Sequence, residues 1–150
     1  MASQPSTPLK PSLLYTIYFL TFEPLAALGG TYLALFNPTR YLRGTLPSTI
    51  PTPPISPLIY SLLVNIGSLY FLFAVAEGVV LRLTRKRSVW FAVLGAFCVT
   101  DVCHLYAVYI LDPERFFAVG KWNGDEWINY GTLNAGLALR IAFMLGFGRN

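Results

Sequence analysis

The chain has 150 residues, of which 55% are hydrophobic and 12% are charged, and its formal net charge is +4. Its mean hydropathy is +0.54. A soluble domain usually carries about twice that share of charged residues, so the composition indicates a membrane protein. The basic residues form short clusters beside apolar segments instead of a stripe with interleaved aromatic residues, which argues against nucleic-acid binding.

Four apolar segments are long enough to cross a bilayer and predict an all-α, polytopic bundle of four transmembrane helices. We expect one domain over residues 13–147, because a chain of this length favours a single domain. Residues 1–12 are polar and proline-rich and are expected to form a disordered tail, with 148–150 as a second short tail. The expected spans are residues 13–36, 57–83, 90–111 and 127–147.

The connection between the first two spans, residues 37–56, contains prolines 38, 47, 51, 53 and 54 and is expected to run extended over the surface. Inside the first span, Pro24 follows Glu23 near the centre. Proline cannot donate a backbone hydrogen bond, so the carbonyl of Phe19 or Leu20 should lose its partner. A free carbonyl beside a carboxyl group is a polar notch, which persists in a membrane only against protein or water.

Small residues recur along one stripe of the fourth expected span. Such a stripe allows close helix–helix approach, so this helix is expected to pack centrally. The stripe consists of Gly131, Ala135, Ala138, Ala142 and Gly146.

Ionisable residues also occur inside the expected spans, where a centred Asp costs about 2.5–3.5 kcal/mol on insertion scales. Asp101 and His104 lie three residues apart on one helical face and are expected to form a hydrogen-bonded pair. A rise of about 1.5 Å per residue predicts two polar layers. The middle layer contains Glu23, Asp101, His104 and Asn134. The second layer pairs Glu77 with Arg140, and Glu23 could compete for the arginine.

Glu23, Asp101 and His104 are the candidate catalytic residues, because carboxyl and imidazole groups transfer protons and intramembrane ionisable residues are often functional. A carboxyl group such as that of Glu23 is expected to stay protonated in a dry pocket and could then donate a proton. Glu77, Asn134 and Arg140 would support the site. The alternative interpretation is that these residues are all structural. Asp101 and His104 would then satisfy each other, Glu77 and Arg140 would form an ion pair that fixes the helix register, and Asn134 would make an interhelical hydrogen bond.

No cofactor or metal is expected. A single histidine does not supply the repeated carboxylate–histidine motif of helical metal sites. No nucleophile elbow or phosphate-binding glycine loop occurs either. The basic residues are concentrated on the side of both termini, in Lys10, the cluster at 82–87 and Arg149, which predicts cytoplasmic termini.

Several motifs together resemble a family of small four-span fungal integral membrane proteins. They are Phe22-Glu23-Pro24, Glu77, Asp101-x-x-His104-x-Tyr106, Trp122-Asn123 and Arg140-Ile141-Ala142-Phe143. The resemblance covers nearly the whole chain and implies a fungal origin and an internal membrane such as the endoplasmic reticulum. Some similar proteins belong to secondary-metabolite clusters for polyketide or terpenoid products, where they assist cyclisation or oxidation. No residue role carries over from the family.

A looser likeness is architectural. Four spans with inward acidic residues are similar to the emopamil-binding and sterol-isomerase proteins, whose membrane carboxylates handle protons on hydrophobic substrates. We therefore hypothesise an isomerase or cyclase without a redox cofactor, acting on a hydrophobic polyketide or terpenoid intermediate within the bilayer. The alternative is a non-catalytic accessory subunit of a membrane-bound biosynthetic oxidase or cyclase complex, in contact with other membrane-bound enzymes.

Overall fold

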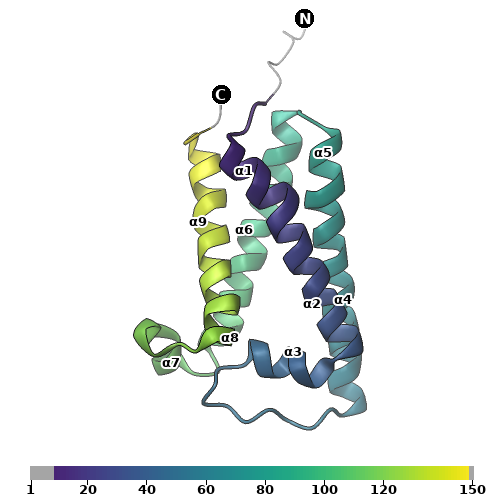
Figure 1. Ribbon diagram of the computed structural model, residues 1–150, viewed down its shortest axis with the longest axis vertical. Coiled ribbons are helices and arrows are strands. Elements are labelled where there is room, and N and C mark those ends of the chain that lie inside the picture. Colours follow the sequence, from purple (N-terminus) through teal and green to yellow (C-terminus); the bar gives the residue numbers. More distant parts are fainter. Residues whose placement is uncertain (1–8, 149–150) are drawn as a thin grey trace, which may run out of the picture.

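The computed structural model describes residues 9–148 and is entirely helical in its regular elements over that range (Figure 1). Residues 1–8 and 149–150, which belong to the two expected tails, lie outside the described residues. In chain order the elements are α1 (Leu13–Ile17), η1 (Tyr18–Phe22), α2 (Glu23–Phe36), α3 (Pro38–Thr45), α4 (Pro57–Val75), η2 (Ala76–Val80), α5 (Leu81–Leu83), α6 (Arg87–Tyr109), α7 (Pro113–Phe117), η3 (Val119–Lys121), α8 (Gly124–Glu126), η4 (Trp127–Gly131) and α9 (Thr132–Leu145).

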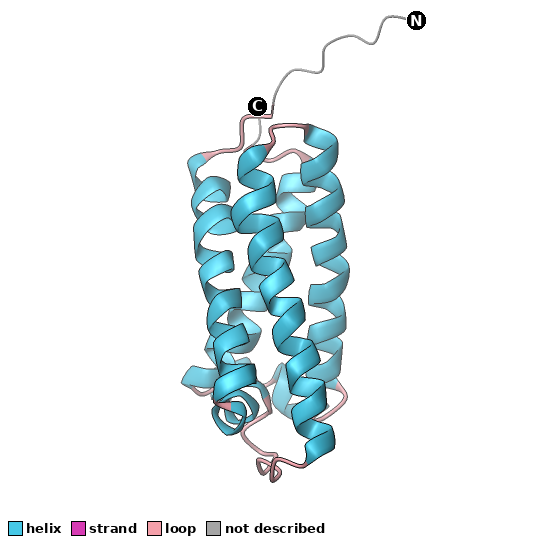
Figure 2. Ribbon diagram, turned by 90° about the vertical axis from the view of Figure 1, so that its right-hand side faces the viewer, coloured by secondary structure: helices cyan, strands magenta, loops and turns pink. Residues whose placement is uncertain are grey.

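These elements join into four long helical segments that stand side by side as an elongated bundle (Figures 1 and 2). The segments are α1–η1–α2, α4–η2–α5, α6 and α8–η4–α9. Residues 9–12, the α5–α6 turn and the end of α9 lie together at what we call the termini end. The short helices α3 and α7 lie at the opposite end, which we call the loop end (Figure 1).

Three of the helical segments are long and apolar enough to cross a membrane: Leu13–Phe36, Pro57–Leu83 and Arg87–Tyr109. They indicate a membrane protein, and many of their large apolar side chains face outward, as lipid contact requires. The segment α8–η4–α9 is more polar, because it carries Asn129, Asn134 and Arg140. The fourth expected span therefore stays a prediction.

The first segment changes its winding just before Pro24. The turn η1 is a π-helix, a wider turn than the α-helix, and it directly precedes Glu23 at the start of α2. The carbonyl of Leu20 accepts a hydrogen bond from the guanidinium of Arg82, which also donates to Thr21 Oγ1 at 3.2 Å. The carbonyl that the proline was expected to release thus has a charged donor from the second segment.

Close packing of α2 against α4 depends on glycines. A Cβ atom added at Gly30 would lie 3.2 Å from the ring of Tyr70, and one at Gly67 would lie 3.0 Å from Leu35. Thr31 Oγ1 donates to the Gly67 carbonyl at 3.2 Å across the same contact. The first two segments are therefore joined closely along their loop-end halves.

The connection 37–56 differs from the expected extended chain, because residues 38–45 form α3. Pro38 occupies the first turn, where its missing N–H is not needed, and the Asn37 side chain accepts from Arg40 N at 3.3 Å as the N-cap. Arg40 also forms a two-point ion pair with Asp125, at 2.7 and 3.2 Å. The helix and this ion pair hold the connection across the loop end.

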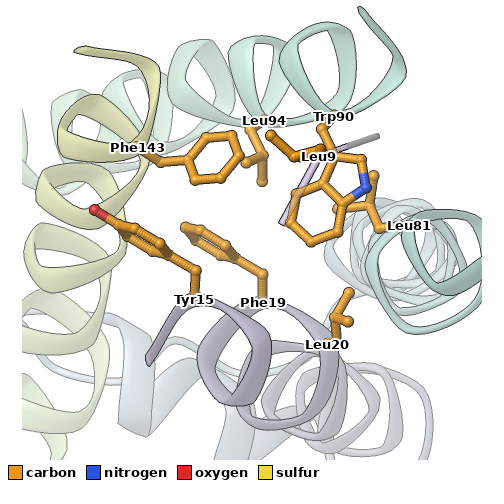
Figure 3. Close-up of a cluster of buried hydrophobic side chains, with 8 residues drawn as sticks. All are labelled: Leu9, Tyr15, Phe19, Leu20, Leu81, Trp90, Leu94 and Phe143. Atoms are coloured by element: carbon orange, nitrogen blue, oxygen red, sulfur yellow. The ribbon is translucent and has the colours of Figure 1, made fainter. Parts of the chain in front are cut away.

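An aromatic core fills the termini end (Figure 3). Phe19 and Phe143 meet edge to face with ring centroids 6.2 Å apart, and Trp90 lies 5.7 Å from Phe143. Leu9 is only 5% exposed in this core, so this part of the expected tail is packed. The core residues are Leu9, Tyr15, Phe19, Leu20, Leu81, Trp90, Leu94 and Phe143.

The small-residue stripe of α9 does not face the bundle interior, contrary to expectation. Ala135 and Ala138 are exposed, whereas Gly136, Arg140 and Phe143 form the buried face. The long side chains of Arg140 and Phe143 fill the space between the segments, and this sets the rotation of the helix. Ala135 and Ala138 are therefore left on the outer surface, and the other three residues of the stripe are partly buried.

Candidate functional site

The guanidinium of Arg140 joins three carboxyl groups from three other helical segments. Its Nη2 atom lies 2.7 Å from Glu23 Oε2 and 3.1 Å from Glu77 Oε1. Its Nη1 atom donates to Asp101 Oδ2. We call these four residues, Arg140, Glu23, Glu77 and Asp101, the carboxyl–arginine cluster. It connects all four helical segments at one point.

The cluster is nearly closed to its surroundings, with one member more open than the rest. The side chains of Arg140, Glu77 and Asp101 are 3%, 2% and 6% exposed. The side chain of Glu23 is 15% exposed. Glu23 is therefore the most accessible carboxyl group of the cluster.

Aromatic rings hold the guanidinium in place. The Cζ atom of Arg140 lies 5.7 Å from the centroid of Phe19 and 5.6 Å from that of Phe97, within the range of cation–π attraction. Its Nε atom is buried and has no hydrogen-bond partner among residues 9–148. The three carboxyl groups therefore do not use every donor of this arginine.

Two close backbone approaches bring the carboxyl groups together. A Cβ atom added at Gly78 would lie 3.2 Å from Pro24, so the contact between these two residues sets Glu23 and Glu77 side by side. Gly136 lies one turn before Arg140 on α9. A Cβ atom there would lie 2.8 Å from Glu23 Oε1 and 3.0 Å from Arg140 Nη1.

Two π-turns lie at acids of the cluster, and a third lies earlier in the fourth segment. Glu23 follows η1, Glu77 lies within η2, and η4 precedes the buried face of α9. A π-turn is rare, and it is found frequently at functional sites because it redirects side chains at a cost in helix stability. Such a turn occurs in three of the four helical segments.

The structure merges the two polar layers expected from depth. It confirms contact between Arg140 and Glu77 and adds both Glu23 and Asp101 to the same arginine. Asp101 and His104 form no hydrogen bond with each other among the described residues. The His104 ring lies 6.5 Å from the ring of Tyr70, and no hydrogen bond joins it to the cluster among the described residues. Asp101 instead accepts a hydrogen bond from the guanidinium of Arg140.

Asn134 does not belong to the cluster. Its side chain is exposed and donates to the Tyr130 carbonyl of its own helix at 2.8 Å, so the expected interhelical hydrogen bond is wrong. Asn134 lines a shallow aromatic groove of about 370 Å³ near the loop end, together with Phe116, Trp122 and Trp127.

The sequence analysis did not identify a further buried carboxylate outside the cluster, Glu126, which is 1% exposed. It accepts two hydrogen bonds from Arg115, at 2.9 and 2.6 Å. It also accepts two from Ser48, at 3.0 and 2.9 Å, and one from Asn123 N at 2.7 Å. Burial alone would raise the pKa of Glu126, but the hydrogen bonds from Arg115, Ser48 and Asn123 outweigh it and lower the pKa to about 2.

This loop-end anchor, Glu126 with Arg115, Ser48 and Asn123, had a signal in the sequence. Asn123 and Glu126 have the spacing of a helix capping box, and the structure shows both of its hydrogen bonds. The anchor ties the connection 37–56 to the start of the fourth segment. Its carboxylate is fully paired, so its role is structural.

The cluster is organised around a guanidinium and not around a metal ion. Among residues 9–148 no three His, Cys, Asp or Glu side chains converge in a way that could hold a metal. The three carboxyl groups formally carry three negative charges against the single positive charge of Arg140. Such an excess is costly in a buried site unless protons reduce it, so the arrangement is suited to holding and exchanging protons.

Comparison with known proteins gives a family without an assigned activity. No curated protein and no solved structure matches the chain. A family model described as Domain of unknown function (DUF7704) matches residues 9–150. Because this match covers nearly the whole sequence, the chain belongs to the DUF7704 family.

Proposed function

We propose that the carboxyl–arginine cluster is an intramembrane acid–base site that isomerises or cyclises a hydrophobic molecule. The observation that carries the proposal is the convergence of three carboxyl groups on one buried guanidinium, at 2.7 Å for Glu23 and 3.1 Å for Glu77. One positive charge balances one carboxylate. The others keep a proton or share one, which provides an acid and a base in the same site.

Glu23 is the group that exchanges the proton with the substrate in this proposal. Its side chain is the most exposed of the three carboxyl groups, at 15%, and it lies at the Pro24 turn. Glu77 and Asp101 remain beside Arg140 as proton acceptors and charge partners. His104 has no role in this scheme, because its ring lies beside Tyr70.

The reaction balances without an oxidant or a reductant. The protonated Glu23 carboxyl group gives its proton to one carbon of a double bond, leaving a cationic centre on the substrate. The Glu23 carboxylate left by this step then removes a proton from the carbon on the other side of the cationic centre, so the double bond re-forms one position along and protonated Glu23 is restored. In a cyclisation, a second double bond attacks the cationic centre before the proton is removed. While the proton is on the substrate the cluster carries one more negative charge, and the fixed positive charge of Arg140 stabilises it.

Three features support a functional cluster over a purely structural one. The π-turns sit beside the acids in the first and second segments. The Nε atom of Arg140 is buried without a hydrogen-bond partner among residues 9–148, whereas a purely structural ion cluster is expected to satisfy its buried donors. A structural ion pair needs one acid, whereas this arginine has three.

The biological setting extends the same proposal. The resemblance to small fungal membrane proteins supports a polyketide or terpenoid intermediate as the substrate. The concentration of basic residues at the termini end supports cytoplasmic termini in the endoplasmic reticulum membrane.

The test is solvent-deuterium incorporation. Membranes containing the wild type would be incubated in deuterated water with a lipid extract of the source organism, and labelled hydrophobic products would be detected by mass spectrometry. Glu23→Gln and Asp101→Asn should lower labelling by about 100-fold or more, because each removes a proton-carrying group. Glu114→Gln, which removes an exposed carboxylate of α7 at the loop end, should leave labelling unchanged. Equal labelling in the wild type, Glu23→Gln and empty membranes would refute the proposal.

A second candidate function is a non-catalytic accessory subunit. It is favoured by the outward position of Ala135 and Ala138, because small exposed residues allow another transmembrane helix to approach. Replacing both with Leu should then release a co-purifying biosynthetic enzyme without changing the melting temperature of this chain. Retention of the enzyme by the double variant would exclude this contact surface.

A further inference from the structure

The termini end carries a pocket whose positive charge is not balanced by an acidic side chain of the described residues that line it. The pocket has a volume of about 410 Å³ and is lined by Leu9, Lys10, Pro11, Thr16 and Arg85. It lies where residues 9–12 cross the α5–α6 turn. Two of its lining residues are cationic, and none is acidic.

The walls of the pocket are fixed by hydrogen bonds. Leu9 N donates to the Arg85 carbonyl at 3.0 Å, and Ser12 N donates to the Gly148 carbonyl at 3.0 Å. The two residues between them, Lys10 and Pro11, are therefore held at the pocket. The α5–α6 turn is fixed in its own right, because Trp90 Nε1 donates to the Thr84 carbonyl at 3.0 Å. Burial of Leu9 in the aromatic core anchors the segment further.

Acidic side chains are absent from all the segments that form this end. The seven Asp and Glu residues lie at positions 23, 77, 101, 112, 114, 125 and 126. The first three of these are bound to Arg140, and the other four lie toward the loop end. Residues 9–22 and 78–100 contain five basic residues and no acid: Lys10, Arg82, Arg85, Lys86 and Arg87.

We propose that this pocket binds the phosphate-bearing headgroup of an anionic phospholipid, with Lys10 and Arg85 as the ligands of the phosphate. Two cationic side chains can bind any phosphate monoester or diester. The position of the pocket at the end of membrane-length helices favours a lipid phosphate over a soluble one. The pocket lies at the end of membrane-length helices, where headgroups are found, and basic pockets beside transmembrane helices bind such headgroups. The exposed Leu13 and Leu14 follow directly along the chain and would meet the acyl chains.

The experiment uses full-length protein reconstituted in phosphatidylcholine nanodiscs with phosphatidylserine or phosphatidic acid as the minor lipid. Native mass spectrometry would count the lipids retained by the wild type, by Lys10→Gln/Arg85→Gln and by a matched control, Arg43→Gln/Lys121→Gln. The control removes the same charge from exposed loop-end positions. The wild type and the control should retain the anionic lipid, and the pocket variant should retain at least tenfold less.

The charge-preserving variant Lys10→Arg/Arg85→Lys should restore retention, and equal melting temperatures in phosphatidylcholine alone would show that all variants are folded. Equal loss in the control would overturn the proposal, because retention would then follow net charge only. Displacement of the lipid by inorganic phosphate or glycerol 3-phosphate at equal concentration would overturn it as well, since the site would then be one for a soluble anion. Equal retention by the wild type and the pocket variant would overturn it directly.

Discussion

Replacing Gly136 with Ala adds a single methyl group at the centre of the carboxyl–arginine cluster. The new Cβ atom would lie 2.8 Å from Glu23 Oε1, 3.0 Å from Arg140 Nη1 and 3.2 Å from Tyr18 Oη. The first of these separations is too short for a carbon and an oxygen that are not bonded. Glu23 cannot simply rotate away, because its other oxygen is bound to Arg140 at 2.7 Å.

The expected magnitude follows from two opposing terms. Weakening the charge-assisted hydrogen bond between Glu23 and Arg140 costs about 1.5–3 kcal/mol. Replacing Gly with Ala in a helix contributes about 1 kcal/mol in the opposite direction. Gly136→Ala should therefore lower the free energy of unfolding by about 0.5–2 kcal/mol.

Gly29 supplies the matched control, because a Cβ atom there would have nothing within 4 Å. Gly29→Ala should raise the free energy of unfolding by about 0.5–1 kcal/mol through helix propensity alone. The assay is denaturant or thermal unfolding of both variants in the same detergent. If Gly136→Ala were stabilised as much as Gly29→Ala, the tight packing of Gly136 against Glu23 would be refuted.

Two further predictions concern groups outside the cluster. Arg82→Gln should lower the free energy of unfolding by about 1–2 kcal/mol, because the Leu20 carbonyl loses its charged donor. Lys86→Gln, the control that removes a neighbouring charge, should leave the free energy of unfolding unchanged. Glu126→Gln should lower the free energy of unfolding by about 2–3 kcal/mol, because the carboxylate that pairs with Arg115 is lost. The pKa of Glu126 falls from 4.5 to about 2 on folding, so its contribution, at most about 3 kcal/mol, is complete above pH 5 and is lost as the pH falls toward 2. Wild-type melting temperatures should fall over that range, and a Glu126→Gln profile that fell just as steeply would contradict this assignment.

The predictions that the structure confirms came mainly from hydropathy and from the backbone chemistry of proline. The apolar segments predicted the first two helical segments at 13–36 and 57–83, and Pro24 predicted an unpaired carbonyl at Phe19 or Leu20. These predictions succeed because they depend on local properties: segment length, apolar content and one missing N–H. The partner of the Leu20 carbonyl, Arg82, lies 62 residues away and needed the tertiary structure.

Depth arithmetic failed where the helices are not regular α-helices. It assumed a constant rise, but π-turns precede or contain Glu23 and Glu77 and change the rotation of each helix. It also treated side chains as points at their backbone position. The arginine side chain is long enough to reach along its helix, so Arg140 contacts Asp101 from a position assigned to a different layer.

The small-residue stripe of the fourth segment was misassigned for a similar reason. Small residues permit close approach, but they do not require it, and the large residues Arg140 and Phe143 decide which face of α9 is buried. The pairing of Asp101 with His104 was likewise inferred from their spacing on one helix. A guanidinium from another helix is a stronger partner for a buried carboxylate than a neutral imidazole.

An acid–base role requires that the cluster holds an exchangeable proton on a carboxyl group beside Arg140. The most direct measurement is infrared difference spectroscopy of the protein in nanodiscs, which detects the carbonyl stretch of a protonated carboxyl group and its shift in deuterated water. We expect such a band at neutral pH in the wild type and in Glu114→Gln. In Glu23→Gln the band should be lost or displaced. A spectrum without any protonated carboxyl band at neutral pH would contradict the claim.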